Sequence, residues 1–184
     1  MNIVVAITGA SGAIYARQCL EILLDNPVVS RIALILSHHA EDVIAAEGVV
    51  LPASERIECF SNDDMWSSLA SGSARWDAML VVPASMGSVA RIATGVSRTL
   101  IERTADVMLK ERRPLVMVVR EAPYSLIHLR NMTALTEAGA IVVPASPSFY
   151  FKPSTIEELC LTVSHRAVEH LGVRVDHREW GSQD

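Results

Sequence analysis

A run of five apolar residues, Leu115–Val119, constrains the fold of this chain more than any other stretch. Pro114 precedes the run and ends an upstream helix, whose last turn carries a cluster of charged residues that begins at Lys110. Such a short run is typical of a buried strand in a parallel sheet. Arg120 and Glu121 follow at once, at the carboxyl end of the strand, where open α/β sheets bind ligands. The pair is therefore a candidate site, and the alternative is a surface ion pair.

Short apolar runs alternate with helical segments along the whole chain. This alternation predicts an α/β fold with a three-layer, doubly wound parallel sheet of the flavodoxin-like or Rossmann-like kind, in a single domain over residues 1–184. Residues 173–184 are expected to form a C-terminal tail, polar apart from Trp180. The predicted strands are Ile3–Ile7, Arg31–Leu36, Ile57–Phe60, Ala78–Val82, Leu115–Val119 and Ile141–Val143, and the predicted helices are Ala13–Leu24, His38–Glu47, Asp63–Ala70, one from Val89, Thr99–Arg113, Tyr124–Glu137 and one capped by Ser154 with Glu157.

The composition excludes several classes of function. A net charge of −5 argues against a nucleic-acid partner. The three cysteines are scattered, so they predict a reducing compartment with neither a disulfide framework nor a zinc site. We expect a cytoplasmic protein, because no signal peptide and no membrane-spanning run is recognisable. The mean hydropathy of +0.29 indicates extra apolar surface, of the kind that is buried between subunits.

Two loops combine glycine with hydroxyl groups at predicted strand ends. The loop Thr8–Gly12 stands between a strand and a helix, a layout that directs backbone N–H groups at a phosphate. Pro83–Ser88 repeats the layout, and Ser37 ends the strand between them. Neither a GxGxxG nor a GK[ST] pattern is present, so a plain turn before a helix is the alternative. The adjacent histidines at 38 and 39 point to different faces and make a poor metal pair.

These motifs resemble the UbiX-type flavin prenyltransferases, formerly described as aromatic acid decarboxylases. The resemblance covers nearly the whole chain, and the block LIERTADVMLKERRPLVMVVREAPYSLIHLRNM is its most specific part. The matching segments are Thr8–Tyr15, Ser37, Ala70–Ser73, Pro83–Ser88, Leu100–Met132 and Pro147–Pro153.

The resemblance implies a flavodoxin-like enzyme that joins a dimethylallyl group from dimethylallyl phosphate to N5 and C6 of reduced FMN. Its product, prenylated FMN, would serve a UbiD-type decarboxylase, and the family assembles as a homododecamer with sites between subunits. No metal is required. The implied FMN-binding residues are Gly9, Ala10, Ser11, Ser37, Ser85, Met86, Gly87, Ser88 and Arg120. The residues implied to bind dimethylallyl phosphate are Lys110, Arg120, Tyr150 and Arg166, and the implied catalytic residues are Glu121, Glu47 and Ser11.

Two alternative functions differ from this one. The first is a flavin-dependent cysteine decarboxylase, since Pro83–Ser85 begins like the PASANT motif of those enzymes but continues Met-Gly-Ser. The second is a non-catalytic flavin carrier that acts as a subunit of an aromatic acid decarboxylase. The presence of Lys110, Glu121, Tyr150 and Arg166 together argues against a mere carrier.

Overall fold

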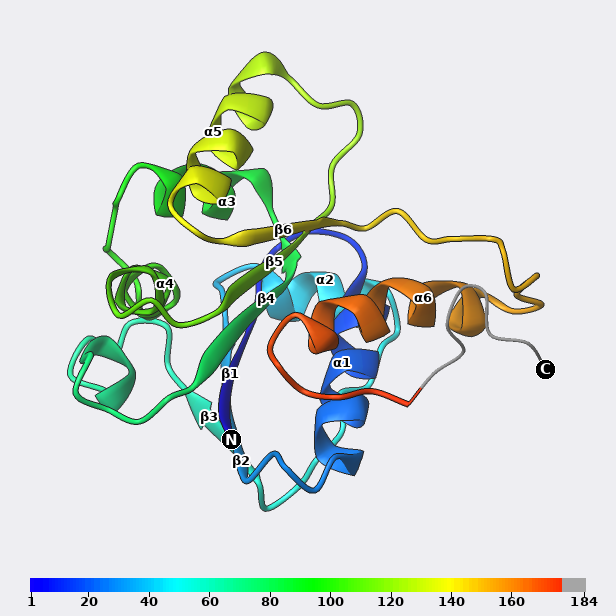
Figure 1. Cartoon of the computed structure of the whole chain (residues 1–184), viewed down its shortest axis with the longest axis horizontal. Coiled ribbons are helices and arrows are strands. Elements are labelled where there is room, and N and C mark those ends of the chain that lie inside the picture. The colour runs from blue at the N-terminus through cyan, green and yellow to red at the C-terminus, as the bar shows by residue number, and fades with distance from the viewer. Residues whose placement is uncertain (177–184) are drawn as a thin grey trace.

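The computed structural model describes residues 1–176, which form three layers with a parallel sheet between two layers of helices (Figure 1). The strand order is β3-β2-β1-β4-β5-β6, and every neighbouring pair is parallel. The predicted fold class is therefore confirmed. The elements are β1 Asn2–Ile7, α1 Ala13–Asp25, β2 Arg31–Leu36, α2 Ala40–Ala46, β3 Ile57–Phe60, the 3-10 helix η1 Ser68–Ala70, β4 Ala78–Ala84, α3 Met86–Ala93, α4 Leu100–Lys110, β5 Leu115–Val119, α5 Leu126–Glu137, β6 Ile141–Pro144 and α6 Ile156–Glu169.

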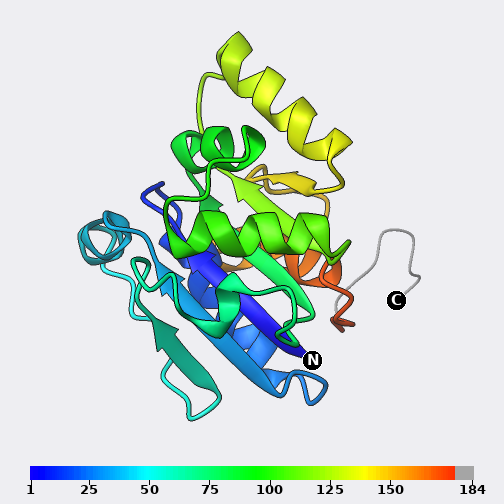
Figure 2. The same ribbon diagram turned by 90° about the vertical axis from the view of Figure 1, so that its left-hand side faces the viewer.

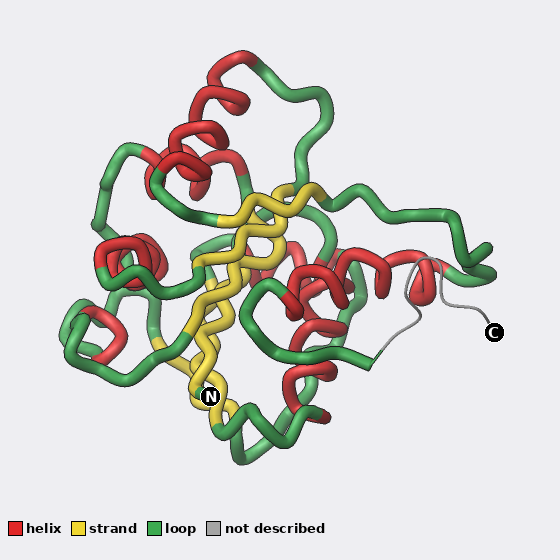
Figure 3. The backbone as a smooth tube through the Cα atoms, viewed as in Figure 1, coloured by secondary structure: helices red, strands yellow, loops and turns green. Residues whose placement is uncertain are grey.

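The strands lie in the middle of the molecule because their side chains are apolar on both faces (Figure 3). Successive residues of a strand point to opposite faces. Ile3 and Val5 of β1 therefore join a core with α1 and α6, whereas Val4 and Ala6 join a second core with α3 and α4. Figure 2 shows α4 crossing one face of the sheet. Two buried cores, one on each face, account for the three layers.

The order of the strands fixes where a ligand can bind. β1 pairs with β2 on one side and with β4 on the other, so the chain changes direction across the sheet between β1 and β4. The loops that follow these two strands lead to helices on opposite faces, α1 and α3. Such a switch point leaves a crevice at the carboxyl ends of the strands.

The caps and lengths of some helices differ from the sequence prediction. The N-cap of α6 is Thr155, whose hydroxyl accepts from Glu158 N, so the predicted cap at Ser154 with Glu157 is wrong by one residue. Ser154 instead donates its backbone N–H and its hydroxyl to the carboxylate of Glu158, at 2.6 and 2.8 Å. Both readings place a hydroxyl three residues before a glutamate, so the local pattern could not separate them.

The predicted helix over Asp63–Ala70 forms only the short η1. Trp66 precedes η1 with its side chain 99% exposed, so no apolar face holds this segment in a longer helix. The predicted helix Thr99–Arg113 ends at Lys110, where a turn leads to β5. The helix predicted from Val89 begins earlier, at Met86, because Ser85 is its N-cap.

The first residues of the predicted C-terminal tail pack on the domain. Val173 is buried in the α1–α6 core, and Val175 packs against the same core. The Arg174 carbonyl accepts a hydrogen bond from Asn26 Nδ2 at 2.8 Å. Trp180 lies outside the described residues. No helix within residues 1–176 has the length and apolar character that crossing a membrane requires.

Candidate active site at the carboxyl edge of the sheet

Thr8 holds together the two loops that flank the switch point. Its side chain is 1% exposed, and its hydroxyl donates to the Pro83 carbonyl oxygen at 2.8 Å. The Thr8 hydroxyl oxygen in turn accepts a hydrogen bond from Ser85 N at 2.8 Å. The turn after β1 is thereby fixed against the turn after β4. Sequence analysis placed Thr8 in the glycine-rich loop but assigned it no role, because its partners lie 75 and 77 residues away.

A cavity of about 250 Å³ opens at this edge. Four of the predicted flavin-binding residues line it, namely Gly9, Ser37, Ser85 and Ser88. The other predicted residues of the two loops do not line it: Ala10 and Met86 are largely buried, the exposed Gly87 lies in the first turn of α3, and Ser11 is exposed outside the cavity. The lining residues that sequence analysis did not select are His38, His39, Asn62, Arg91, Thr99, Ile101 and Glu102.

The N-terminus of α1 is satisfied by Glu47 rather than by Ser11. Gly12 is the N-cap residue, with a φ of 113° that favours glycine, and it makes no side-chain cap. The carboxylate of Glu47 accepts from Gly12 N at 2.8 Å and from Ala13 N at 2.7 Å. Ser11 therefore does not cap α1, and its side chain instead hydrogen-bonds to Glu47. Because Glu47 already occupies these donors, they are not available to a phosphate.

The same contacts set the ionisation of Glu47. Partial burial opposes the charged form, but hydrogen bonds from the Ser11 side chain and from the Gly12 and Ala13 backbone outweigh it. The nearby Arg120 guanidinium acts in the same direction, so the pKa of Glu47 lies below its usual value. Glu47 is thus a carboxylate at neutral pH, beside the loop that follows β1.

Arg120 and Glu121 do not form the surface ion pair that was the alternative reading, since no ion pair joins them within residues 1–176. Arg120 Nε donates to the Ser11 carbonyl oxygen at 3.3 Å. Glu121 is half-buried and accepts from Ala122 N at 3.0 Å. The structure thus brings Ser11, Glu47 and Arg120 together beside the switch point, with Glu121 next in the chain.

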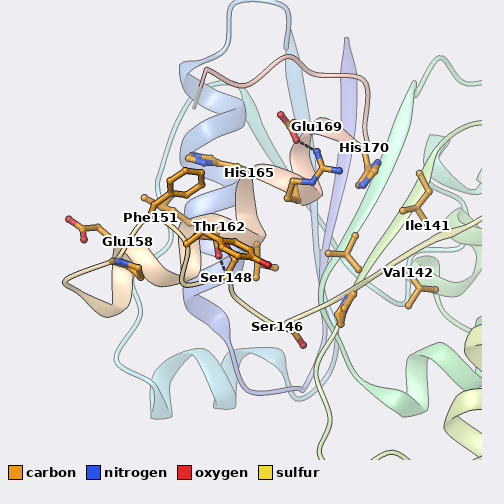
Figure 4. Close-up of a pocket in the computed structure, with 17 residues that line it drawn as sticks. Ile141, Val142, Ser146, Ser148, Phe151, Glu158, Thr162, His165, Glu169 and His170 are labelled. Carbon is orange, nitrogen blue, oxygen red and sulfur yellow. Dashed lines mark hydrogen bonds and ion pairs between the residues drawn. The ribbon is translucent and has the colours of Figure 1, made fainter. Parts of the chain in front are cut away.

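Tyr150 and Arg166 line a second and larger cavity of about 820 Å³, between β6, the following loop and α6 (Figure 4). The loop begins beside Arg120, because Ala145 N donates to the Val119 carbonyl oxygen at 2.9 Å. Arg166 forms an ion pair with Glu169 at 2.6 Å. The two predicted phosphate-binding residues therefore share one concave surface.

Lys110 lies at the other end of the sheet. It ends α4, and four residues join it to the start of β5 at Leu115, whereas Arg120 directly follows β5. Five residues of strand separate the two ends by roughly 16 Å. Lys110 forms an ion pair with Glu111. The pair lies against Gly72, since a Cβ added at position 72 would come within 2.6 Å of Lys110 Nζ. Within one subunit, Lys110 is therefore not part of the group formed by Arg120, Tyr150 and Arg166.

The described residues contain no group of three or more histidine, cysteine, aspartate or glutamate side chains that could hold a metal ion. The larger cavity is lined mainly by apolar side chains beside Arg166 and Tyr150, whereas the smaller one is lined mainly by polar residues, among them several hydroxyl groups and the Arg91 guanidinium. Such groups suit phosphate esters and a polar ring.

Comparisons with known proteins agree with this chemistry. A family model described as Flavoprotein matches residues 1–167. The flavin prenyltransferase UbiX of Methanocaldococcus jannaschii is 42% identical over 186 residues, which cover 99% of this chain and 100% of that protein.

Two solved structures are similar over nearly the whole chain. AnUbiX (PadA1) in complex with FMN and dimethylallyl pyrophosphate is 41% identical with a TM-score of 0.86, covering 97% of this chain and 98% of that one. A dodecameric FMN-dependent UbiX-like decarboxylase from Escherichia coli O157:H7 is 36% identical with a TM-score of 0.90, covering 99% and 100%.

Proposed function

The chain belongs to the UbiX-type flavin prenyltransferases, and from this membership we propose that it transfers a dimethylallyl group from dimethylallyl phosphate to N5 and C6 of reduced FMN. The observation that carries the proposal is the 42% identity to a flavin prenyltransferase over nearly the entire chain. The hydroxyl-lined cavity at the switch point supports it. The chain is accordingly an enzyme that alkylates a flavin.

The residues at the switch point fit a flavin. Gly9 follows β1, Ser37 follows β2, and Ser85 and Ser88 follow β4, so neutral donors from three strand ends line the cavity and suit a phosphate ester and a ribityl chain. FMN supplies the nucleophilic ring atoms, and the chain supplies the binding and the orientation. Arg120, beside the Ser11 carbonyl, stands at the edge of this site. Ala10, Met86 and Gly87 belong to the loop and the helix turn that carry these lining residues, and they do not line the cavity themselves.

The departing phosphate needs cations. An allylic phosphate leaves readily when its developing negative charge is stabilised, and each well-placed donor contributes about 3 kcal/mol. Arg166 and Tyr150 share one surface, and Arg120 stands where the neighbouring loop begins. Lys110 lies at the opposite end of the sheet, so its part in the same phosphate site requires a second subunit. We therefore place the donor site between subunits.

Two carboxylates have different tasks in this scheme. Glu121, half-buried at the carboxyl end of β5, moves protons as the new ring closes. Glu47 stays ionised and holds the Ser11–Gly12 turn, with Ser11 hydrogen-bonded to it. An allylic cation prefers π-faces to water, and the exposed ring of Tyr150 offers one.

The proposed assembly is a homo-oligomer, of dodecameric size. Leu126, Ile127 and Leu129 of α5 are 60%, 67% and 47% exposed, and Tyr150 is 70% exposed. Exposed apolar side chains on this scale are typical of surfaces buried in an assembly. Light scattering at micromolar concentration is expected to give a multiple of 20.0 kDa, and a monomer mass would contradict a shared site.

The deciding experiment incubates the protein with reduced FMN and dimethylallyl phosphate and measures the mass of the flavin. We expect the mass of prenylated FMN, the product that a UbiD-type decarboxylase would use. A carrier would bind FMN and leave its mass unchanged. A cysteine decarboxylase would release carbon dioxide from a peptide with a C-terminal cysteine.

A further inference from the structure

Arg91 lies along the cavity at the switch point, although neither a sequence motif nor the family resemblance assigns it a role. It stands in α3, two turns from the N-cap Ser85, and its side chain is 48% exposed. Its Nη2 group donates to the Ser88 hydroxyl at 3.4 Å, and the Ser88 and Ser85 hydroxyls are 3.1 Å apart. A guanidinium and two hydroxyls thus converge on one end of the cavity.

Glu102 fixes the guanidinium in this position. Its side chain is 2% exposed and accepts from Arg91 Nε. It also accepts from Arg98 N at 2.8 Å and Thr99 N at 3.1 Å. Burial opposes ionisation of Glu102, but these donors outweigh it and lower the pKa of the carboxyl. Glu102 is therefore an ionised, fully hydrogen-bonded support.

Glu102 is buried whereas Arg91 is half-exposed, and such an ion pair is weak as a source of stability, because the cost of desolvating the carboxylate offsets the attraction between the charges. The ion pair between Arg91 and Glu102 is better explained by the position in which it holds the Arg91 guanidinium. Nε is used on Glu102 and Nη2 on Ser88, and within residues 1–176 Nη1 forms no hydrogen bond. The third guanidinium nitrogen is thereby left for an acceptor that the chain itself does not provide.

Gly87 leaves the space that this arrangement needs. A Cβ at position 87 would lie 3.2 Å from Arg91 Nη1, which is closer than most side chains tolerate. The guanidinium therefore occupies the space beside the first turn of α3, where a longer side chain at position 87 would otherwise extend. The donors at the start of α1, by contrast, are taken by Glu47. The anion-binding end of the cavity is consequently the end that contains Ser85, Ser88 and Arg91.

We infer that Arg91 binds the phosphate monoester of FMN and that Glu102 is its positioning residue, so that the pair makes the cavity selective for FMN over riboflavin. The inference rests on the proposed flavin site and adds the group that discriminates between phosphorylated and unphosphorylated flavin. A guanidinium bound to a phosphate dianion is a charge-assisted contact, which riboflavin does not offer.

The test compares FMN and riboflavin binding by fluorescence titration of wild type, Arg91→Met, Arg91→Lys, Glu102→Gln and the control Arg75→Met. Arg75 is exposed and lies at the opposite edge of the sheet, directly before the buried Trp76. Arg91→Met is expected to weaken FMN binding roughly 10- to 100-fold and to leave riboflavin binding unchanged. Arg91→Lys restores part of the loss. Glu102→Gln weakens FMN alone, by a smaller factor, and Arg75→Met changes neither.

Equal loss of both flavins in Arg91→Met, or unchanged FMN binding, would overturn the inference. If Arg91→Met does not fold, the test instead measures how strongly inorganic phosphate competes with FMN for wild type and for Arg91→Lys. Phosphate should raise the apparent Kd for FMN in wild type more than in Arg91→Lys, and equal competition refutes the role. Wild type that binds neither flavin would instead refute the proposed function, so the two failures are distinguishable.

Discussion

The carboxylate of Glu47 accepts two contacts from the backbone N–H of Gly12, at 2.8 and 3.1 Å, across 35 residues of sequence. Glu47 follows α2, and Gly12 begins α1, so one side chain closes the end of a helix in another part of the chain. The family resemblance implies a catalytic role for Glu47, and in the structure its carboxylate also stabilises the loop after β1.

Glu47→Gln is expected to lower the free energy of unfolding by about 1 kcal/mol at pH 7, because the helix loses a charged cap. The folded pKa of Glu47 is depressed, so its contribution is fully present above the unfolded pKa of about 4.3 and is lost as the pH falls through the folded value. Thermal melting from pH 7 to pH 3 checks the prediction. The difference between wild type and variant should shrink at low pH, and a constant gap would contradict it. Glu41→Gln, an exposed acid in α2, is the control.

Thr8→Val preserves shape and removes the hydroxyl that joins the two loops. Ser85 N loses its acceptor in a part-buried position, which costs about 1–3 kcal/mol. FMN and riboflavin should both bind more weakly, since both loops move. Denaturant unfolding and flavin titration measure the two effects. Thr136→Val, which removes an exposed hydroxyl in α5, should stay within about 0.5 kcal/mol of wild type.

Glu121→Gln is expected to retain binding of FMN and of dimethylallyl phosphate but to slow product formation by roughly 100-fold or more. The carboxylate is the proposed proton carrier, and the amide keeps its shape and its hydrogen bond to Ala122 N. Single-turnover analysis of flavin mass measures the rate. Turnover equal to that of wild type would leave Glu121 a purely local role at the end of β5.

Arg166→Ala should weaken the use of dimethylallyl phosphate by roughly 10- to 150-fold, because a charged hydrogen bond is lost, while FMN affinity is unchanged. Separate titrations of the two ligands measure this. Loss of FMN with retention of the donor would mean that the two phosphate sites are interchanged. Glu169→Gln is the matched variant, because it removes the ion-pair partner of Arg166 and keeps the guanidinium.

Co-expression of Lys110→Ala with Arg166→Ala tests whether one site draws on two subunits. Each variant alone should have little activity. Random mixing gives roughly a quarter of the sites both intact residues, so activity should return to about that fraction of wild type. Mixed assemblies as inactive as the single variants would place both residues in the same subunit's site and contradict the sharing.

Sequence analysis was most successful where the signals were local. Pro114 and Arg120 flank β5, so both of its ends were predicted correctly. The switch-point loops followed from the same strand pattern. The hydrogen bonds that hold those loops in place were not predictable, because the partners of Thr8 and Glu47 are distant in sequence and come near only in the folded chain.

Two further features were predictable from the sequence. Thr99 and Glu102 match a capping box, which the structure contains, although the contact of Glu102 with Arg91 arises only from packing of α4 beside α3. A helix that precedes a parallel strand must end at the amino edge of the sheet, so the position of Lys110 followed from chain order alone. Lys110 was grouped with Arg120 because of the family resemblance, and that resemblance does not say which subunit supplies each residue.

The separation of Lys110 from Arg120 along β5 means that the number of complete active sites depends on how the subunits are joined. If each subunit lends its Lys110 to a neighbour, an open string of subunits has an unfilled site at one end, whereas a closed arrangement completes every site. Dilution would therefore remove activity in whole sites rather than weaken all of them alike. Half-assembled protein would bind FMN at every switch point and yet alkylate it only where two subunits meet.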